Sequence, residues 1–122
     1  MGECIAATVS LDLDNYWAYL RAHGDNTWQD YPSFLDIAGP RILRFFEQRN
    51  IKPKIFVVGQ DLLSNDNAKI VESMSKAGFE IRNHSYSHKP DFHSLSIIKQ
   101  EDEIRSCEER IQEVVGDKPL GF

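Results

Sequence analysis

The chain has 122 residues, of which 41% are apolar, 27% charged and 11% aromatic, and its formal net charge is -5. This length and composition are typical of one globular domain that needs no disulfide scaffold, and they argue against intrinsic disorder. The acidic balance argues against a nucleic-acid partner, and no apolar run approaches the roughly 18 residues that a membrane span needs. The two cysteines, Cys4 and Cys107, match neither a disulfide framework nor a zinc motif.

The first predicted element is a short buried strand in the apolar run 5–13, which ends in acidic residues. A long loop rich in aromatic residues is predicted over 15–32, with a turn at 24–26. A short helix is then predicted over 33–38. A longer helix is predicted over 40–50, where proline at the first position suits a helix start.

Two further strands are predicted on either side of another helix. The continuous apolar run 55–58 is typical of a parallel strand that is buried on both faces. The helix after it is predicted to be capped by Asn65 or Asp66 and to stop at Gly78. Residues 79–82 form the third predicted strand.

The last predicted helix begins at Ser94 or Ser96 and ends at Gly116. It carries one apolar stripe, which consists of Ile97, Ile104, Cys107, Ile111, Val114 and Val115. The tail 118–122 has the pattern of a fourth strand beginning. Alternating strands and helices predict an α/β fold with a parallel sheet or barrel.

Residues with metal-binding chemistry follow two of the predicted strands. Asp12 and Asp14 are two residues apart, so both are expected on one face of the strand end, with Leu13 on the other. His84 and His88 are four residues apart, and one helical turn would bring both imidazoles to one face. Because the C-terminal ends of neighbouring parallel strands meet, the pattern predicts a catalytic metal site with two histidines and a carboxylate.

Each half of this pattern also has a plainer interpretation. Acidic residues after a strand often cap the next helix, and two histidines four residues apart are often exposed surface residues. The zinc-protease motif is excluded because Ser85 stands where that motif has glutamate. The occurrence of both patterns at strand ends favours the metal site.

These motifs resemble those of the polysaccharide deacetylases of carbohydrate esterase family 4, which contain the NodB homology domain. The family's first motif, in some branches Asp-x-Asp at a strand end, is similar to residues 10–15. Its second motif, His-[Ser/Thr]-x-x-His, is similar to residues 84–88, and its Gly-x-Glu-Ile-x-Asn-His approach is similar to residues 78–84. The resemblance extends over residues 8–122.

The resemblance implies a fold and a set of roles. The fold is a distorted (β/α) barrel with parallel strands, of which residues 1–122 would supply about the first half, the N-terminal portion of a deacetylase catalytic domain. Asp14, His84 and His88 would bind a divalent metal ion, usually zinc, and Asp12 would be the catalytic base. Such an ion polarises the acetamide carbonyl and lowers the pKa of its bound water.

Other residues near the motifs receive supporting roles. Asn83 and Ser85 are expected to orient the metal ligands through hydrogen bonds. Aromatic rings stack on sugar faces, so the aromatic loop either contacts a glycan or covers the core of the barrel. The candidate substrate contacts are Trp17, Tyr19, His23, Trp28 and His93. His93 is otherwise a fourth metal ligand or a solvated loop residue.

Two departures from the family pattern bear on activity. Lys89 separates His88 from Pro90, where the family commonly has His-Pro directly. The family's arginine after Pro-x-Gly-Phe and its late Leu-x-x-His motif, which carries the catalytic acid, have no counterpart before Phe122. We therefore expect a domain truncated at its C-terminal end and inactive alone. Its open strand edges make a homodimer of the fragment a candidate state.

The activity that the resemblance implies is metal-dependent removal of N-acetyl groups from an N-acetylated sugar in a polysaccharide, peptidoglycan or glycan precursor. One alternative is a related hydrolase of non-peptide C–N bonds, such as a sugar deformylase or cyclic amide hydrolase. Another is an inactive module that binds metal or carbohydrate. The expected compartment is the cytoplasm, or an extracytoplasmic one if a signal segment has been removed.

Overall fold

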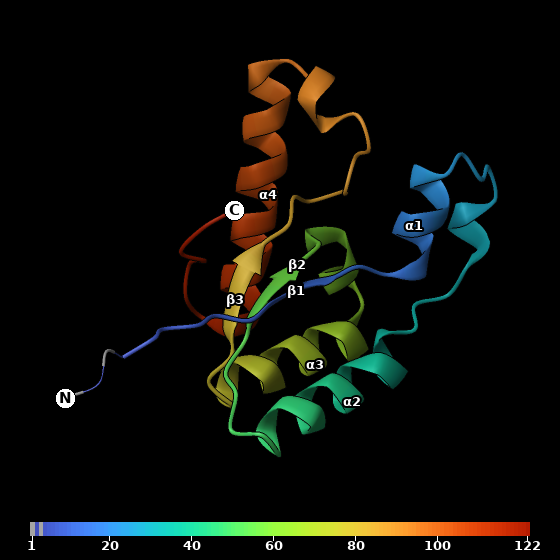
Figure 1. The fold of residues 1–122 in the computed structure, drawn as a ribbon. Helices are drawn as coiled ribbons and strands as arrows, with labels where there is room; N and C mark the ends of the chain where they lie inside the picture. Colours follow the sequence, from blue (N-terminus) through green and yellow to red (C-terminus); the bar gives the residue numbers. More distant parts are fainter. Residues whose placement is uncertain (1, 3) are drawn as a thin grey trace.

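Three short parallel strands form the centre of the fold (Figure 1). In the computed structural model, which describes residues 2 and 4–122, β1 (Ser10–Leu13), β2 (Lys54–Val57) and β3 (Glu80–Asn83) pair in the order β1-β2-β3. Both pairings are parallel, so the chain crosses over through helical segments between β1 and β2 and between β2 and β3. The predicted parallel α/β architecture is confirmed.

One face of the sheet packs against helices α2 (Leu35–Glu47), α3 (Asn65–Lys76) and α4 (Ile97–Val115), as Figure 1 shows. The buried apolar cluster between these two layers consists of Leu13, Leu35, Ile55, Val57, Leu62, Val71, Met74, Phe79, Ile81, Cys107 and Ile111. The strand register places Asp12, Phe56 and Arg82 side by side on neighbouring strands. All three lie on the face of the sheet that is turned away from these helices. That second face is the one that carries the candidate site.

Strand β1 is shorter than the apolar run 5–13 that predicts it. Ile5 is 91% exposed, and strand pairing begins only at Ser10, which lies opposite Lys54. The backbone N–H of Lys54 donates to the carbonyl of Val9. Among the residues that the structure describes, no strand lies beside the apolar residues before Val9, so their composition alone does not make them a strand.

The predicted loop 15–32 contains a helix, α1 (Tyr16–Ala22), and a 3-10 turn, Trp28–Asp30. The side chain of Asn15 accepts from the N–H of Tyr16 and caps α1. The helical period was obscured because α1 carries rings on both of its sides, with Trp17 buried and Tyr16 and Tyr19 exposed. Gly24 has a φ of 80°, so the predicted turn is present.

Helix α2 corrects the prediction of two separate helices at 33–38 and 40–50. The helix runs through Pro40, which lies in its second turn and has no N–H to donate to the carbonyl of Asp36. The cap of α3 (Asn65–Lys76) is Ser64, which accepts from the N–H of Asn67, and not Asn65 or Asp66 as predicted, so the helix begins one or two residues earlier than expected.

Helix α4 begins after Ser96, whose side chain caps it, and ends at Gly116 in a left-handed conformation, as predicted. Ile97 is exposed, so the predicted apolar stripe begins later in the helix. The tail returns to the sheet, where the N–H of Asn83 donates to the carbonyl of Gly121. None of the helices in the described part of the chain is long and apolar enough to cross a membrane.

Candidate metal centre

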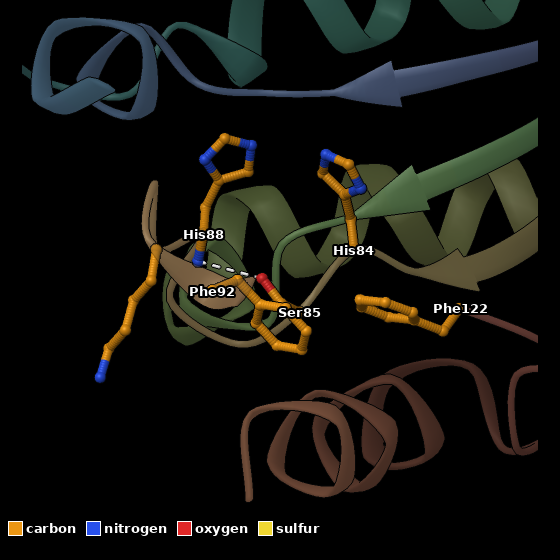
Figure 2. A pocket seen from close by; sticks show the side chains of 6 residues that line it. His84, Ser85, His88, Phe92 and Phe122 are labelled. Atoms are coloured by element: carbon orange, nitrogen blue, oxygen red, sulfur yellow. Dashed lines mark hydrogen bonds between the residues drawn. The ribbon is translucent and has the colours of Figure 1, made fainter. Parts of the chain in front are cut away.

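Asp14, His84 and His88 converge at the C-terminal ends of β1 and β3. Nε2 of His84 lies 3.3 Å from Oδ1 of Asp14, and Nε2 of His88 lies 3.4 Å from Oδ2 of the same carboxylate. One ligand atom from each side chain lies within 4.8 Å of the others. Figure 2 shows both imidazoles pointing toward the chain that follows β1. The structure therefore brings together three residues that are far apart in the sequence.

The ionised carboxylate of Asp14 suits a bound cation. The imidazole of His84, and next that of His88, lowers the pKa of the Asp14 carboxyl well below its usual range, although burial opposes the shift. Asp14 in turn raises the pKa of His88. Asp14 is therefore ionised at neutral pH, which is the state that binds a metal ion.

The donor set fits a divalent ion. Oδ1 of Asp14 is buried and makes no hydrogen bond to any residue that the structure describes, and the Nε2 atoms of His84 and His88 face this carboxylate. Two imidazole nitrogens and a carboxylate oxygen are ligands that zinc and related ions accept. Three protein ligands also leave a position open for water or substrate, as catalytic sites require.

The two histidines are held by a strained loop rather than by the predicted helical turn. Ser85 has a φ of 62° and His88 a φ of 47°, both in the left-handed region that most residues avoid. Oγ of Ser85 accepts from the N–H of His88 at 3.2 Å (Figure 2). Asn83 accepts from the N–H of Ser85 at 2.9 Å and donates to the carbonyl of Ile104 at 2.7 Å. Asn83 and Ser85 thus contact the backbone of the loop.

Glu103 is a buried residue of α4 that sequence reasoning missed. Its carboxylate accepts from both the N–H and the hydroxyl of Ser87, at 2.8 and 2.7 Å, and Nζ of Lys89 lies 3.9 Å from it. On the other side of the loop, Arg21 of α1 donates to the carbonyl of Ser87 at 2.9 Å. The available signal was the position of Glu103, four residues before Cys107 on the apolar face of α4.

Asp61 is a second buried carboxylate that the sequence analysis did not single out. Its Oδ1 accepts from the indole N–H of Trp17 at 2.7 Å and from the Asn15 amide at 3.2 Å. Burial raises the pKa of Asp61. Its Oδ2 has no hydrogen-bond partner among the described residues. The carboxylate connects the start of α1 to the turn after β2. The sequence signal that could have identified Asp61 is an acidic residue next to apolar residues.

Asp12, the predicted base, is exposed on β1, two residues before Asp14. Leu13 between them is buried on the helix side of the sheet, as the period-two pattern predicts. Asp12 is aligned with Phe56, whose ring centroid lies 6.3 Å from that of His84. Asp12 therefore lies on the same face as the metal cluster.

The predicted substrate contacts occupy three different environments. Trp17 is buried, and its ring centroid lies 5.5 Å from that of Trp28. Tyr19 and His23 lie on the exposed side of α1. His93 is exposed in the 3-10 turn Phe92–Ser94 and does not belong to the cluster of potential ligands.

The sequence of the chain matches a known family. The family model for polysaccharide deacetylase matches residues 26–122, which include His84 and His88. The chain belongs to the polysaccharide deacetylase family. The uncharacterized protein YlxY of Bacillus subtilis (strain 168) is 28% identical over 82 residues, which are 67% of this chain and 25% of that protein.

Solved structures show the same fold. A protein assigned to the polysaccharide deacetylases in Mycobacterium smegmatis has a TM-score of 0.74 and 22% identity over 94% of this chain and 41% of its own. A family 4 acetyl xylan esterase from Clostridium thermocellum in complex with a cobalt ion has a TM-score of 0.66 and 23% identity, over 92% of this chain and 44% of its own. BA3943, a CE4 family pseudoenzyme from Bacillus anthracis, has a TM-score of 0.66 and 18% identity, over 92% of this chain and 32% of its own.

The chain spans less than half the length of each of these proteins. The prediction that it forms part of a NodB-type (β/α) barrel is confirmed by the fold that it shares with polysaccharide deacetylases.

Proposed function

We propose that residues 1–122 are the N-terminal portion of the catalytic domain of a metal-dependent deacetylase. Its substrate is an N-acetylated sugar in a polysaccharide, peptidoglycan or glycan precursor. The observation that carries the proposal is the convergence of Asp14, His84 and His88, one carboxylate and two imidazoles, in a chain of the polysaccharide deacetylase family.

In this proposal, Asp14, His84 and His88 hold a divalent ion, and zinc is the preferred candidate because its protein ligands are nitrogen, sulfur and carboxylate oxygen. When bound, the ion would polarise the acetamide carbonyl and lower the pKa of a water molecule. Asp12, on the same face of the sheet, is the base that removes the proton from the attacking water. The cobalt ion of the related acetyl xylan esterase supports a divalent ion in this fold.

Zinc titration by calorimetry tests the metal ligands. We expect the chain to bind one zinc ion. Asp14→Ala or His84→Ala should weaken zinc binding by more than the roughly 10–100-fold that is lost when a group hydrogen-bonded to a metal ligand is removed. His93→Ala is the matched control, because His93 is a histidine outside the cluster. Unchanged affinity in the first two variants contradicts the metal assignment.

Acetate release by the full-length protein tests the reaction and the base. We expect release from N-acetylglucosamine oligomers, and its loss in Asp12→Asn with zinc affinity unchanged. Wild-type release by Asp12→Asn would refute the role of Asp12. Release of formate, or opening of a cyclic amide in place of acetate release, would instead favour a related C–N hydrolase.

A second candidate function is an inactive module that binds metal or carbohydrate. The specific observation in its favour is the likeness to BA3943, a pseudoenzyme with the same fold. Full-length protein that binds zinc and glycan but releases no acetate from any N-acetylated oligomer would establish this second function.

A further inference from the structure

The exposed side of α1 carries a row of stacked rings. Tyr16 and Tyr19 are stacked, with ring centroids 5.9 Å apart and ring planes at 11°. The ring of His23 continues the row, 4.1 Å from that of Tyr19, and Tyr31 meets Tyr16 edge to face at 5.5 Å. Tyr16 is 44% exposed and Tyr19 55% exposed. Contiguous exposed rings of this kind mark a binding surface more often than single exposed residues do.

These rings border a cavity of about 440 Å³, which lies within the usual size range of small-molecule sites. Ala18 and Ala22, one turn apart on α1, leave the space open because their side chains are short. Phe34 also lines the cavity. Asp14 and His88 belong to its lining, so the cavity is continuous with the candidate metal centre.

The helix that bears the rings is held firmly in place. Asn15 caps α1, and the indole of Trp17 donates to the buried carboxylate of Asp61 at 2.7 Å. Arg21 donates to the carbonyl of Ser87 in the loop that carries His88. The same contacts that anchor α1 therefore fix the position of the rings relative to the metal ligands.

The lining of the cavity favours an uncharged ligand with both apolar and hydroxylated surfaces. Among its residues are no lysine and no arginine, and the one carboxylate belongs to the metal cluster. This composition disfavours a phosphate-bearing ligand, which would require cations. Ring faces pack against the C–H groups of a pyranose, while tyrosine hydroxyls and the His23 imidazole can hydrogen-bond to sugar hydroxyls.

We propose that this cavity is the sugar subsite, where the pyranose ring of an N-acetylated glycan packs against Tyr16 and Tyr19 beside the metal centre. The proposal rests on the proposed function, because the metal cluster defines which end of the cavity faces the reaction. Tyr16 and Phe34 thereby join Tyr19 and His23 as substrate contacts, whereas Trp17 supports α1 from the buried side.

The test is the binding of tri-N-acetylchitotriose to the chain. NMR titration and saturation transfer to the sugar protons measure this binding. Tyr19→Ala removes a ring, and Ala22→Phe fills the cavity from an exposed helix position without altering a metal ligand. We expect affinity to fall about threefold to tenfold in Tyr19→Ala and to be lost in Ala22→Phe. Phe45→Ala, an exposed ring on α2, is the control with unchanged affinity.

Zinc titration of the same variants separates this inference from the proposed function. Zinc affinity should be unchanged in Tyr19→Ala and Ala22→Phe. Trisaccharide binding that is insensitive to both variants, or absent, overturns the sugar subsite even if zinc binds as proposed. A trisaccharide that binds in an Ala22→Phe-sensitive manner to a chain without zinc affinity supports the subsite and contradicts the metal-dependent reaction. Self-association of the chain that Ala22→Phe abolishes would make the cavity a dimer contact and overturn the subsite.

Discussion

Glu103 accepts two hydrogen bonds from Ser87, one from its backbone N–H at 2.8 Å and one from its hydroxyl at 2.7 Å. Ser87 precedes His88, whose backbone is in a left-handed conformation. A buried acid on α4 therefore determines the course of a loop that would otherwise relax, and with it the position of a metal ligand.

We expect Glu103→Gln to weaken zinc binding by about 10–100-fold, the usual effect of losing an outer contact at a metal site. The glutamine amide keeps one acceptor, for the N–H of Ser87, and places an N–H donor against the Ser87 hydroxyl, so the contact with that hydroxyl reverses its direction and loses its charge. Calorimetric zinc titration measures the effect, and Glu101→Gln at an exposed position of the same helix is the control. Equal zinc affinities in Glu103→Gln and the wild type would show that the contact only stabilises the fold.

Asp61 should make stability depend on pH. Burial raises the pKa of this carboxyl above its ordinary value of 3.8, so the folded state holds the proton more tightly than the unfolded state. The stabilising contribution is complete below pH 3.8 and is lost as the pH rises through the folded pKa.

Urea unfolding of the metal-free chain and of Asp61→Asn, compared from pH 4 upward, tests this sign. Asparagine can still accept from the Trp17 indole, so the variant isolates the charge. We expect the free energy of unfolding of the wild type to fall relative to that of Asp61→Asn as the pH rises. A constant difference across this range would contradict the raised pKa.

The stability of the fold should depend on the two N–H donors of the Asn15 side chain. Its Oδ1 accepts from the N–H groups of Tyr16 and Phe34, and its Nδ2 donates to Ser33 and Asp61. Asn15→Asp removes both donations and places a second carboxylate beside Asp61. We expect the free energy of unfolding at neutral pH to fall by about 2 kcal/mol or more.

The matched control is Asn26→Asp, at an exposed position of the turn after α1. Urea unfolding should leave that variant within about 0.5 kcal/mol of the wild type, as is usual for surface substitutions. An equally small effect of Asn15→Asp would show that this hydrogen-bond network contributes little to stability.

The sequence predicted the parts of the molecule that depend on local pattern. The apolar run of β2 and the period of α4 are local signals, and so is the spacing that places Asp12 and Asp14 on one face. The spacing of His84 and His88 predicted that they lie close together through a helical turn, whereas the structure brings them together through a loop. The order of strands and helices then brings Asp14 to the histidines, because parallel strands end at the same edge of the sheet.

The residues that sequence reasoning missed depend on contacts between distant segments. Glu103 holds a loop 16 residues away, and Asp61 holds α1 from 44 residues away. Helix α1 was hidden because its rings are distributed on both of its sides. The length of β1 is decided by where β2 begins, which the composition of β1 does not reveal.

The most direct test of the metal centre is a crystal of the chain grown with zinc and measured on both sides of the zinc absorption edge. We predict one anomalous peak between the carboxylate of Asp14 and the Nε2 atoms of His84 and His88, at about 2.0–2.2 Å from each ligand atom. No peak at this cluster, or a peak bound by other residues while these three stay unligated, would contradict it.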